Sequence, residues 1–183
     1  MSDTKRLKST NHSAHAKRHL TQQAMDDQMA RRGYAVGWHG TAGHWTKSVF
    51  GKPHGVPAFY LFVEHGPAES YAVLRSFDIN EKPRVAKFYV STSNVLTLQD
   101  DGGGAKPFVK VLQKAKADGY AVVQLLGALD DQYYRLGKHG KIIDPPAEKA
   151  LDEAGPADEW VVLDPAVLVS AETARRRLAS GKI

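Results

Sequence analysis

The stretch GWHGTAG, residues 37–43, is the first part of the chain whose residue types could serve a chemical site. In it His39 stands before Gly40 and Thr41, just after the apolar run at residues 34–36. A histidine in a protein core needs no glycine behind it, whereas a glycine leaves the main chain open to close approach. The pattern therefore indicates an imidazole and a bare backbone that are presented together to a ligand.

Two tyrosines and a glutamate follow in an order that suits the same site. Tyr60 lies in the apolar run AFYLFV, and Tyr71 follows it by 11 residues in a segment with helical spacing. Glu159 precedes the apolar run WVVL, where a carboxylate is unfavourable unless it lies at a solvated strand end or takes part in chemistry. The glutamate is therefore the residue of this set that packing explains least well.

Each of these residues taken alone also has an ordinary structural explanation. His39 by itself is more typical of a hydrogen-bonded or surface histidine, and Tyr60 of a strand residue that packs. Tyr71 fits the core face of its helix. The ordered set, with its fixed gap between the tyrosines and its glutamate before a buried strand, favours the functional interpretation.

The ordered set resembles the ADP-ribosyltransferase superfamily, in the branch of diphtheria toxin and the poly(ADP-ribose) polymerases. The signature of that branch is a His-Tyr-Glu triad spread over three strands. The resemblance spans residues 34–169, with His-Gly-Thr at 39–41, FYLF at 59–62, ESYA at 69–72 and EWVVLD at 159–164. It implies a single α+β domain with a split, mixed or antiparallel sheet and flanking helices.

The resemblance also implies an enzyme that cleaves the nicotinamide–ribose bond of NAD, its substrate, with Glu159, His39 and Tyr60 as catalytic residues. Glu159 would stabilise an oxocarbenium-like transition state and accept a hydrogen bond from the ribose 2′-hydroxyl. Tyr60 and Tyr71 would stack on the nicotinamide ring. The main chain of Gly40 would bind the carboxamide, and His39 the adenine-side ribose, with Thr41 beside them in the NAD-binding set.

The sequence does not define the acceptor of the ADP-ribose. Two places before the catalytic glutamate, relatives that modify arginine, asparagine or cysteine carry glutamate or glutamine, and here the residue is Ala157. Arginine-directed toxins also have arginine at the position of His39. A mono-ADP-ribosyltransferase acting on protein or nucleic acid is expected, as in a bacterial effector, a toxin or a phage-delivered modifier. A cognate immunity protein is an expected partner, and the cytoplasm, its own or that of a target cell, is the expected place of action.

Two other functions stay open. An NAD glycohydrolase toxin would use the same residues and transfer ADP-ribose to water. A non-enzymatic nucleic-acid-binding module would depend on the basic first residues, on the arginines at 175–177 and on the run YYR at 133–135. No metal is expected, because no paired carboxylates accompany the spaced histidines at a recognisable interval. Those histidines are His12, His15, His19, His39, His44 and His54.

The composition is that of an ordinary globular chain, with 183 residues, 42% hydrophobic and 25% charged. The absence of cysteine excludes disulfides, thiolate catalysis and cysteine zinc sites. No window approaches the roughly 18 apolar residues of a membrane span, so no membrane partner is expected. Residues 1–18 are expected to be a disordered basic leader, and residues 19–183 the catalytic domain.

Apolar periodicity predicts the elements that must position the candidate residues. Strands are expected at 34–38, 58–63, 85–90, 95–98, 120–126 and 159–163, and helices at 20–32, 67–76, 106–117 and 171–180. Residues 100–104 are expected to be a flexible connector, and residues 129–158 a long polar connection. The strands outnumber the helices and do not alternate with them regularly, which favours an α+β domain over a doubly wound parallel sheet.

Overall fold

The computed structural model describes residues 20–43, 56–99, 105–129, 135–136, 142–143 and 156–183. The expected leader at residues 1–18 and the connector at residues 100–104 lie outside these ranges. The helices of the described part are α1 (Gln22–Ala30), α2 (His65–Ile79), α3 (Ala105–Ala117), the 3-10 helix η2 (Pro165–Val167) and α5 (Ala171–Ala179). None of these helices is both long and apolar enough to cross a membrane.

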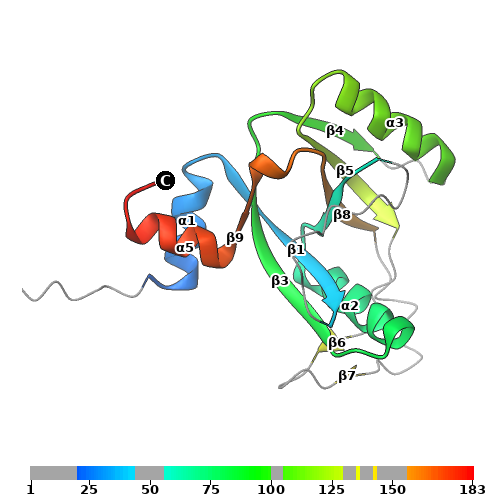
Figure 1. Ribbon diagram of the computed structural model, residues 1–183, viewed down its shortest axis with the longest axis horizontal. Coiled ribbons are helices and arrows are strands. Elements are labelled where there is room, and N and C mark those ends of the chain that lie inside the picture. Colours follow the sequence, from blue (N-terminus) through cyan, green and yellow to red (C-terminus); the bar gives the residue numbers. More distant parts are fainter. Residues whose placement is uncertain (1–19, 44–55, 100–104, 130–134, 137–141, 144–155) are drawn as a thin grey trace, which may run out of the picture.

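Seven strands form one mixed sheet in the order β4-β5-β8-β2-β1-β3-β9 (Figure 1). They are β1 (Tyr34–Ala42), β2 (Phe59–Phe62), β3 (Pro83–Ser91), β4 (Val95–Gln99), β5 (Val122–Leu129), β8 (Pro156–Val162) and β9 (Leu168–Ser170). A separate antiparallel pair consists of β6 (Arg135–Leu136) and β7 (Ile142–Ile143). In the sheet β4 and β5 are parallel, and the other neighbours are antiparallel. The prediction of a single α+β domain with a mixed sheet is confirmed.

Successive side chains along each strand point to opposite faces of the sheet, so the core is divided between the two faces. On one face, residues of β5 and β8 pack with the buried residues of α3, and this cluster includes Val123, Leu125, Val161, Leu112 and Ala115. On the other face, residues of β2 and β8 pack with residues of β3, and this cluster includes Phe59, Leu61, Trp160, Val162, Phe88 and Val90. The rings of Phe59 and Phe88 are 5.2 Å apart although β1 lies between their strands, so the sheet curves toward this second face.

The sheet opens between β1 and β2. Strand β1 pairs with β3 along its nine residues, but with β2 only at Trp38, opposite Phe62. Gly37 allows the close approach at this bend, since a Cβ there would lie 3.0 Å from side-chain atoms of Leu61. The β1–β3 pair and the β5–β8 pair consequently diverge from each other toward α2 and α3 (Figure 1).

Helix α2 lies directly on β1. Ala68 and Ala72 of α2 are fully buried where the helix meets the strand, and Gly40 of β1 lies against the helix turn that these two alanines form. A Cβ on Gly40 would collide with the carbonyl oxygen of Ala68 and lie 2.9 Å from the nitrogen of Ala72. Because both obstacles are main chain, this contact requires glycine.

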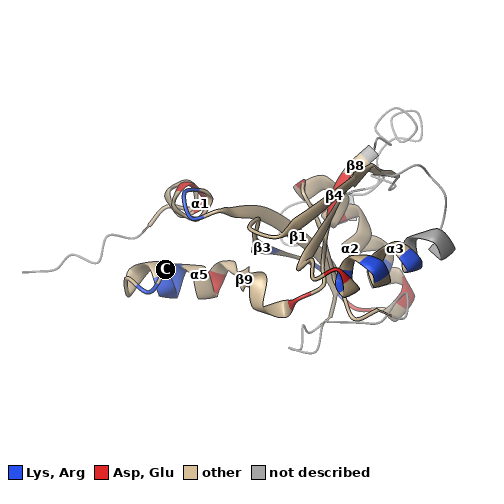
Figure 2. Cartoon of the chain, turned by 90° about the horizontal axis from the view of Figure 1, so that it is seen from above, with Lys and Arg blue, Asp and Glu red and all other residues tan. Residues whose placement is uncertain are grey.

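Helices α1 and α5 pack together at the β9 end of the sheet. Met25 and Met29 of α1 share a buried cluster with Ala174 of α5 and with Tyr89 and Val169 of β3 and β9. Figures 1 and 2 show the two helices side by side, away from α2 and α3. Residues 20–33 and 171–183 are called the α1–α5 lobe below.

Several elements differ from their predicted bounds. Strand β1 continues through His39 to Ala42 instead of ending at residue 38, because β3 offers a partner at every position. Strand β8 begins at Pro156, so the expected connection at 129–158 is shorter, and it contains β6 and β7. The three-residue strand β9, which has too few residues to show a periodicity, was not expected.

Candidate functional site

Tyr60 and Glu159 lie on neighbouring strands and on the same face of the sheet. In the β2–β8 ladder Tyr60 is opposite Val161 and Phe62 is opposite Glu159, so the two polar side chains are diagonal neighbours. Burial, and after it the charge of Glu159, raises the pKa of the Tyr60 phenol to about 12. The phenol is therefore protonated at neutral pH, where it can donate a hydrogen bond but does not act as a base.

Glu159 is the fourth residue of β8, not the first residue of the strand as predicted. The carbonyl oxygen of Asp158 accepts a hydrogen bond from the N–H of Val63 at 2.8 Å, which continues the contact between β8 and the β2 segment past Glu159. The glutamate is half-buried in the middle of the strand. A frayed, solvated strand end therefore does not account for this carboxylate.

A β-bulge in β5 lies beside Glu159. The register shifts between Leu125, opposite Glu159, and Ala128, so that β5 has one extra residue across from Asp158. Gly127 adopts a φ of 72°, and its N–H donates to Oδ1 of Asp158 at 2.9 Å. Bulges frequently lie next to functional sites, where they change the direction of a side chain. Neither Asp158 nor Gly127 was marked by a sequence motif.

His39 lies in the opening between β1 and β2. Its Nδ1 is 2.9 Å from the carbonyl oxygen of Tyr60, and its ring centroid is 4.4 Å from that of Phe59. Burial lowers the pKa of His39, although the hydrogen bond to Tyr60 acts in the opposite direction. Since a carbonyl oxygen only accepts, Nδ1 carries the proton, and Nε2 of the neutral ring is an acceptor that no described residue uses.

The three residues of the triad meet at Tyr60 but on different faces of the sheet. The phenol of Tyr60 lies on the face of Glu159, whereas the imidazole of His39 lies with Phe59 on the opposite face and contacts the main chain of Tyr60. The strands that carry the triad are consecutive in the sheet, in the order β8-β2-β1. The structure thus brings Tyr60 together with each of the other two residues.

Gly40 and Thr41 lie on β1 directly after His39. The absence of a side chain at Gly40 is accounted for by the packing of α2 on β1, which the sequence pattern did not reveal. Thr41 is half-buried and is paired with Arg84 of β3. Beyond Trp38 the described part of the chain gives β1 no strand partner on its β2 side.

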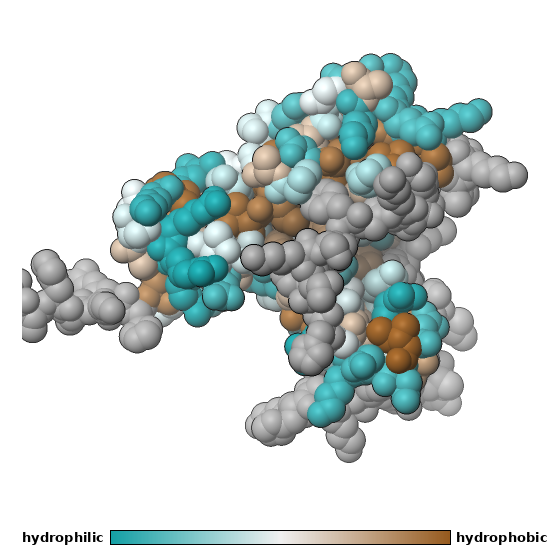
Figure 3. Space-filling model, viewed as in Figure 1, coloured by the Kyte–Doolittle hydropathy of each residue, from teal (hydrophilic) through white to brown (hydrophobic). Residues whose placement is uncertain are grey.

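Tyr71 lies on the outside of α2 and is 41% exposed, so it is not a core residue of its helix. Its ring centroid is 6.0 Å from that of Phe62, which is the β2 residue opposite Glu159. The large hydrophobic residues exposed in the described part are all on α2: Tyr71, Leu74, Phe77 and Ile79. Figure 3 shows hydrophobic surface over this helix. Tyr71 is therefore accessible and one side chain away from the Tyr60–Glu159 pair.

Trp38 joins a group of side chains near the start of α2. The His65 ring meets it edge-on at 4.5 Å between centroids, and Nζ of Lys87 is 5.1 Å from its ring centroid. Nδ1 of His65 is 3.5 Å from Oε1 of Glu69, whose side chain is only 12% exposed. The four-residue spacing of His65 and Glu69 in a helical segment is a sequence signal that would have identified this pair.

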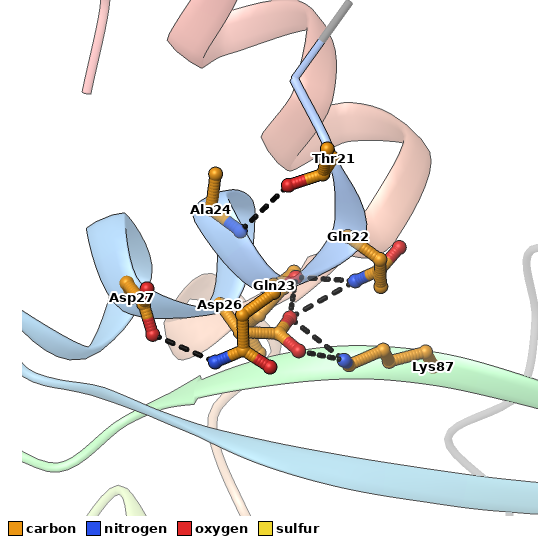
Figure 4. Close-up of polar contacts among 8 residues, drawn as sticks. Thr21, Gln22, Gln23, Ala24, Asp26, Asp27 and Lys87 are labelled. Carbon is orange, nitrogen blue, oxygen red and sulfur yellow. Dashed lines mark hydrogen bonds and ion pairs between the residues drawn. The ribbon is translucent and has the colours of Figure 1, made fainter.

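A second polar cluster ties α1 to β3 (Figure 4). Nζ of Lys87 is 2.7 and 2.6 Å from the two carboxylate oxygens of Asp26, and the hydroxyl of Tyr89 donates to Oδ1 of Asp26 at 2.6 Å. Burial raises the pKa of Asp26, but hydrogen bonds from Lys87, Tyr89 and Gln22 outweigh it and lower the pKa below its usual value. Because Asp26 and Lys87 are 61 residues apart, no local pattern predicts their contact.

In the part of the chain that the structure describes, no group of three or more His, Asp or Glu is arranged to hold a metal ion. Of the spaced histidines, five lie outside that part: His12, His15, His19, His44 and His54. A scan against models of known protein families and a search of curated proteins each found no match for this chain.

Proposed function

We propose that the chain is a mono-ADP-ribosyltransferase that uses NAD as its substrate. The bond between the ribose C1′ and the nicotinamide nitrogen breaks, and its electron pair leaves with nicotinamide. A nucleophile of a macromolecular acceptor then forms a bond to C1′ and gives up its proton to solvent or to a base. Positive charge develops on the sugar between these events, so a carboxylate near C1′ accelerates the reaction.

One observation carries the proposal: His39, Tyr60 and Glu159 lie on three consecutive strands, and the Glu159 carboxylate is close enough to the Tyr60 phenol to raise its pKa. A half-buried carboxylate beside a neutral phenol is suited to stabilise the positive charge that moves from the pyridinium ring to the ribose as the bond breaks. Glu159 is proposed to face the ribose that becomes cationic.

The neighbours of Glu159 support roles in binding. Tyr71 is exposed beside Phe62, and Tyr60 lies on the same face, so each ring is proposed to stack on nicotinamide. His39, whose Nε2 is an acceptor that no described residue uses, suits a ribose hydroxyl. The edge of β1 beyond Trp38 has no described strand partner toward β2, which supports main-chain binding of the carboxamide by Gly40, with Thr41 beside it.

The test is release of nicotinamide from NAD by the wild type and by the variant Glu159→Gln. The substitution keeps the size of the side chain and removes its charge, so we expect a rate roughly 10²- to 10³-fold lower with folding retained. Glu172→Gln is the matched control, because that glutamate is 81% exposed on α5, and its rate should equal that of the wild type. Equal rates for wild type and Glu159→Gln would disprove the proposal.

Mass spectrometry of a cell lysate incubated with the protein and NAD identifies the acceptor. An added ADP-ribose on protein or nucleic acid, absent with Glu159→Gln, supports transfer. Nicotinamide release with free ADP-ribose alone would assign the same site to an NAD glycohydrolase and would overturn the transferase proposal.

A further inference from the structure

Positive charge is concentrated in two segments that lie far apart in the sequence. Residues 1–33 and 171–183 together contain eleven Lys or Arg against four Asp or Glu. Residues 34–170, which include the candidate site, contain fourteen against sixteen. The basic character of the chain, with a net charge of +5, therefore comes from these two segments.

The fold places the described parts of these segments, residues 20–33 and 171–183, against each other. These parts contain six Lys or Arg against three Asp or Glu, and the other basic residues of the first segment lie outside the described residues. The apolar side of α5, through Ala174 and Leu178, packs on Met25 and Met29 of α1. Figure 2 shows basic residues on both helices at the end of the molecule away from α2. The exposed cations of the α1–α5 lobe are Arg31, Arg32, Arg175, Arg176, Arg177 and Lys182.

Most of this charge is available to a partner. The side chains of Arg31, Arg175 and Arg177 make no hydrogen bond or ion pair with another described residue. Arg176 is 3.8 Å from Glu172, and both side chains are more than two-thirds exposed, at 71% and 81%, so water screens this pair. The carboxylate of Asp26 is already bound by Lys87 and that of Asp27 by Gln23.

The chemistry of the lobe favours a phosphate backbone over a lipid surface. Five of its six exposed cations are arginines, whose planar guanidinium binds phosphate through paired hydrogen bonds. A helix that lies on a membrane needs a free apolar face, and the apolar residues Ala174 and Leu178 of α5 are packed on α1. The large exposed hydrophobic residues of the described chain are on α2, so the lobe also lacks rings for base stacking.

We propose that the α1–α5 lobe is a nucleic-acid-binding site that contacts sugar–phosphate backbones without reading base sequence. The binding is expected to weaken steeply with salt, because each neutralised phosphate releases counterions. This inference does not depend on the proposed transfer reaction, since binding requires neither NAD nor turnover.

The test is fluorescence anisotropy with a labelled DNA duplex of about two helical turns, in a salt series from about 50 to 200 mM. We expect the triple variant R175Q/R176Q/R177Q to bind about tenfold more weakly at ~100 mM salt. The slope of log affinity against log salt should become shallower by about 0.9 for each phosphate that the variant no longer neutralises. The variant R175K/R176K/R177K keeps the charge and should keep the slope.

The matched control is K110Q/K114Q/K116Q, which removes the same charge from the exposed side of α3. Its affinity should stay within about threefold of the wild type, because charges more than a Debye length from the contact are largely screened. A second variant of the lobe, R31Q/R32Q on the α1 side, should weaken binding in the same direction as the α5 variant. Circular dichroism establishes that each variant is folded.

Three results would overturn the inference. The first is that the wild type does not bind the duplex at ~50 mM salt. The second is that the α3 control loses as much affinity as the α5 variant. The third is that the lobe binds vesicles of phosphatidylserine and phosphatidylcholine and does not bind the duplex. Glu159→Gln should bind the duplex like the wild type, so a failed NAD assay and a failed binding assay are separate outcomes.

Discussion

At the scale of single residues, His39 shows how position decides protonation. Its ring is buried beside Phe59, and burial lowers its pKa despite the hydrogen bond from Nδ1 to the Tyr60 carbonyl. The folded chain therefore holds a neutral imidazole with its proton on Nδ1. A neutral ring can accept a hydrogen bond from a hydroxyl group at Nε2, which a charged ring cannot do.

The lowered pKa of His39 predicts how stability depends on pH. Below about pH 6.5 the unfolded chain binds a proton at this position that the folded chain resists, so the free energy of unfolding should fall. The fall continues until the pH reaches the lower pKa of the folded state, and it is at most about 1.4 kcal/mol per pH unit. Urea unfolding of wild type and His39→Gln between about pH 7 and 5 measures it.

The variant His39→Gln should lack this part of the pH dependence, whatever its stability at neutral pH. Gln113→Ala is the control, because Gln113 is exposed on α3 and has no titrating group, so the slope should equal that of the wild type. Parallel curves for wild type and His39→Gln would show that His39 is not responsible.

At the scale of elements, the contact between α2 and β1 depends on Gly40. We expect Gly40→Ala to lower the free energy of unfolding by about 3 kcal/mol, because its Cβ meets the main chain of Ala68 and Ala72. Gly37→Ala is the comparison on the same strand. Its Cβ would lie 3.0 Å from Cβ and Cδ1 of buried Leu61, a tight contact without a collision with main chain, so the loss should be smaller, about 1 to 2 kcal/mol.

Denaturant unfolding of both glycine variants measures the difference. If the two alanine substitutions lowered the free energy of unfolding equally, α2 would be able to move away from β1 to make room for a Cβ. The packing explanation for Gly40 would then fail.

At the scale of the whole molecule, the α1–α5 lobe is attached to the sheet by an apolar cluster and by the Asp26–Lys87 ion pair. We expect Asp26→Asn to lower the free energy of unfolding by about 1 to 3 kcal/mol, because Lys87, only 11% exposed, loses its counterion. The double variant Asp26→Leu with Lys87→Met should recover part of this loss, since it leaves no buried charge.

The loss caused by Asp26→Asn should also depend on pH, and urea unfolding checks both effects. The folded-state pKa of Asp26 is lowered, so its contribution is present above the unfolded value of about 3.9 and disappears as the pH falls through the folded value. Wild type and Asp26→Asn should therefore converge in acid. A constant difference down to about pH 2 would contradict the ion pair as the cause.

Much of the fold was predictable because its signals are local. The helix at 106–117 was expected from the spacing of Leu112 and Ala115, and both are buried in the structure. The glycines after the first and third helices, Gly33 and Gly119, have positive φ, as helix stops commonly do. Strand β9 and the early start of β8 depend on pairing with strands elsewhere in the chain, so no local pattern predicted them.

The candidate site was predictable in its residues and less so in its arrangement. His39, Tyr60, Tyr71 and Glu159 were marked by type and order, and three of them lie on consecutive strands. The face that each side chain occupies follows from the register of β2 with β8 and from the single pairing of β1 with β2. Register is set by contacts between distant segments, and a slip of one residue would move every side chain to the other face.

By itself the sequence determined where most of the helices and strands form and which residues are fit for chemistry, because capping, periodicity and side-chain type act over a few neighbouring positions. The tertiary structure alone decided the strand order that joins β8, β2 and β1, the reason for Gly40 and the packing of the basic helix α5 on α1. Each of these depends on burial and hydrogen bonding between segments far apart in the chain, where the folded backbone, not the local pattern, sets the distance.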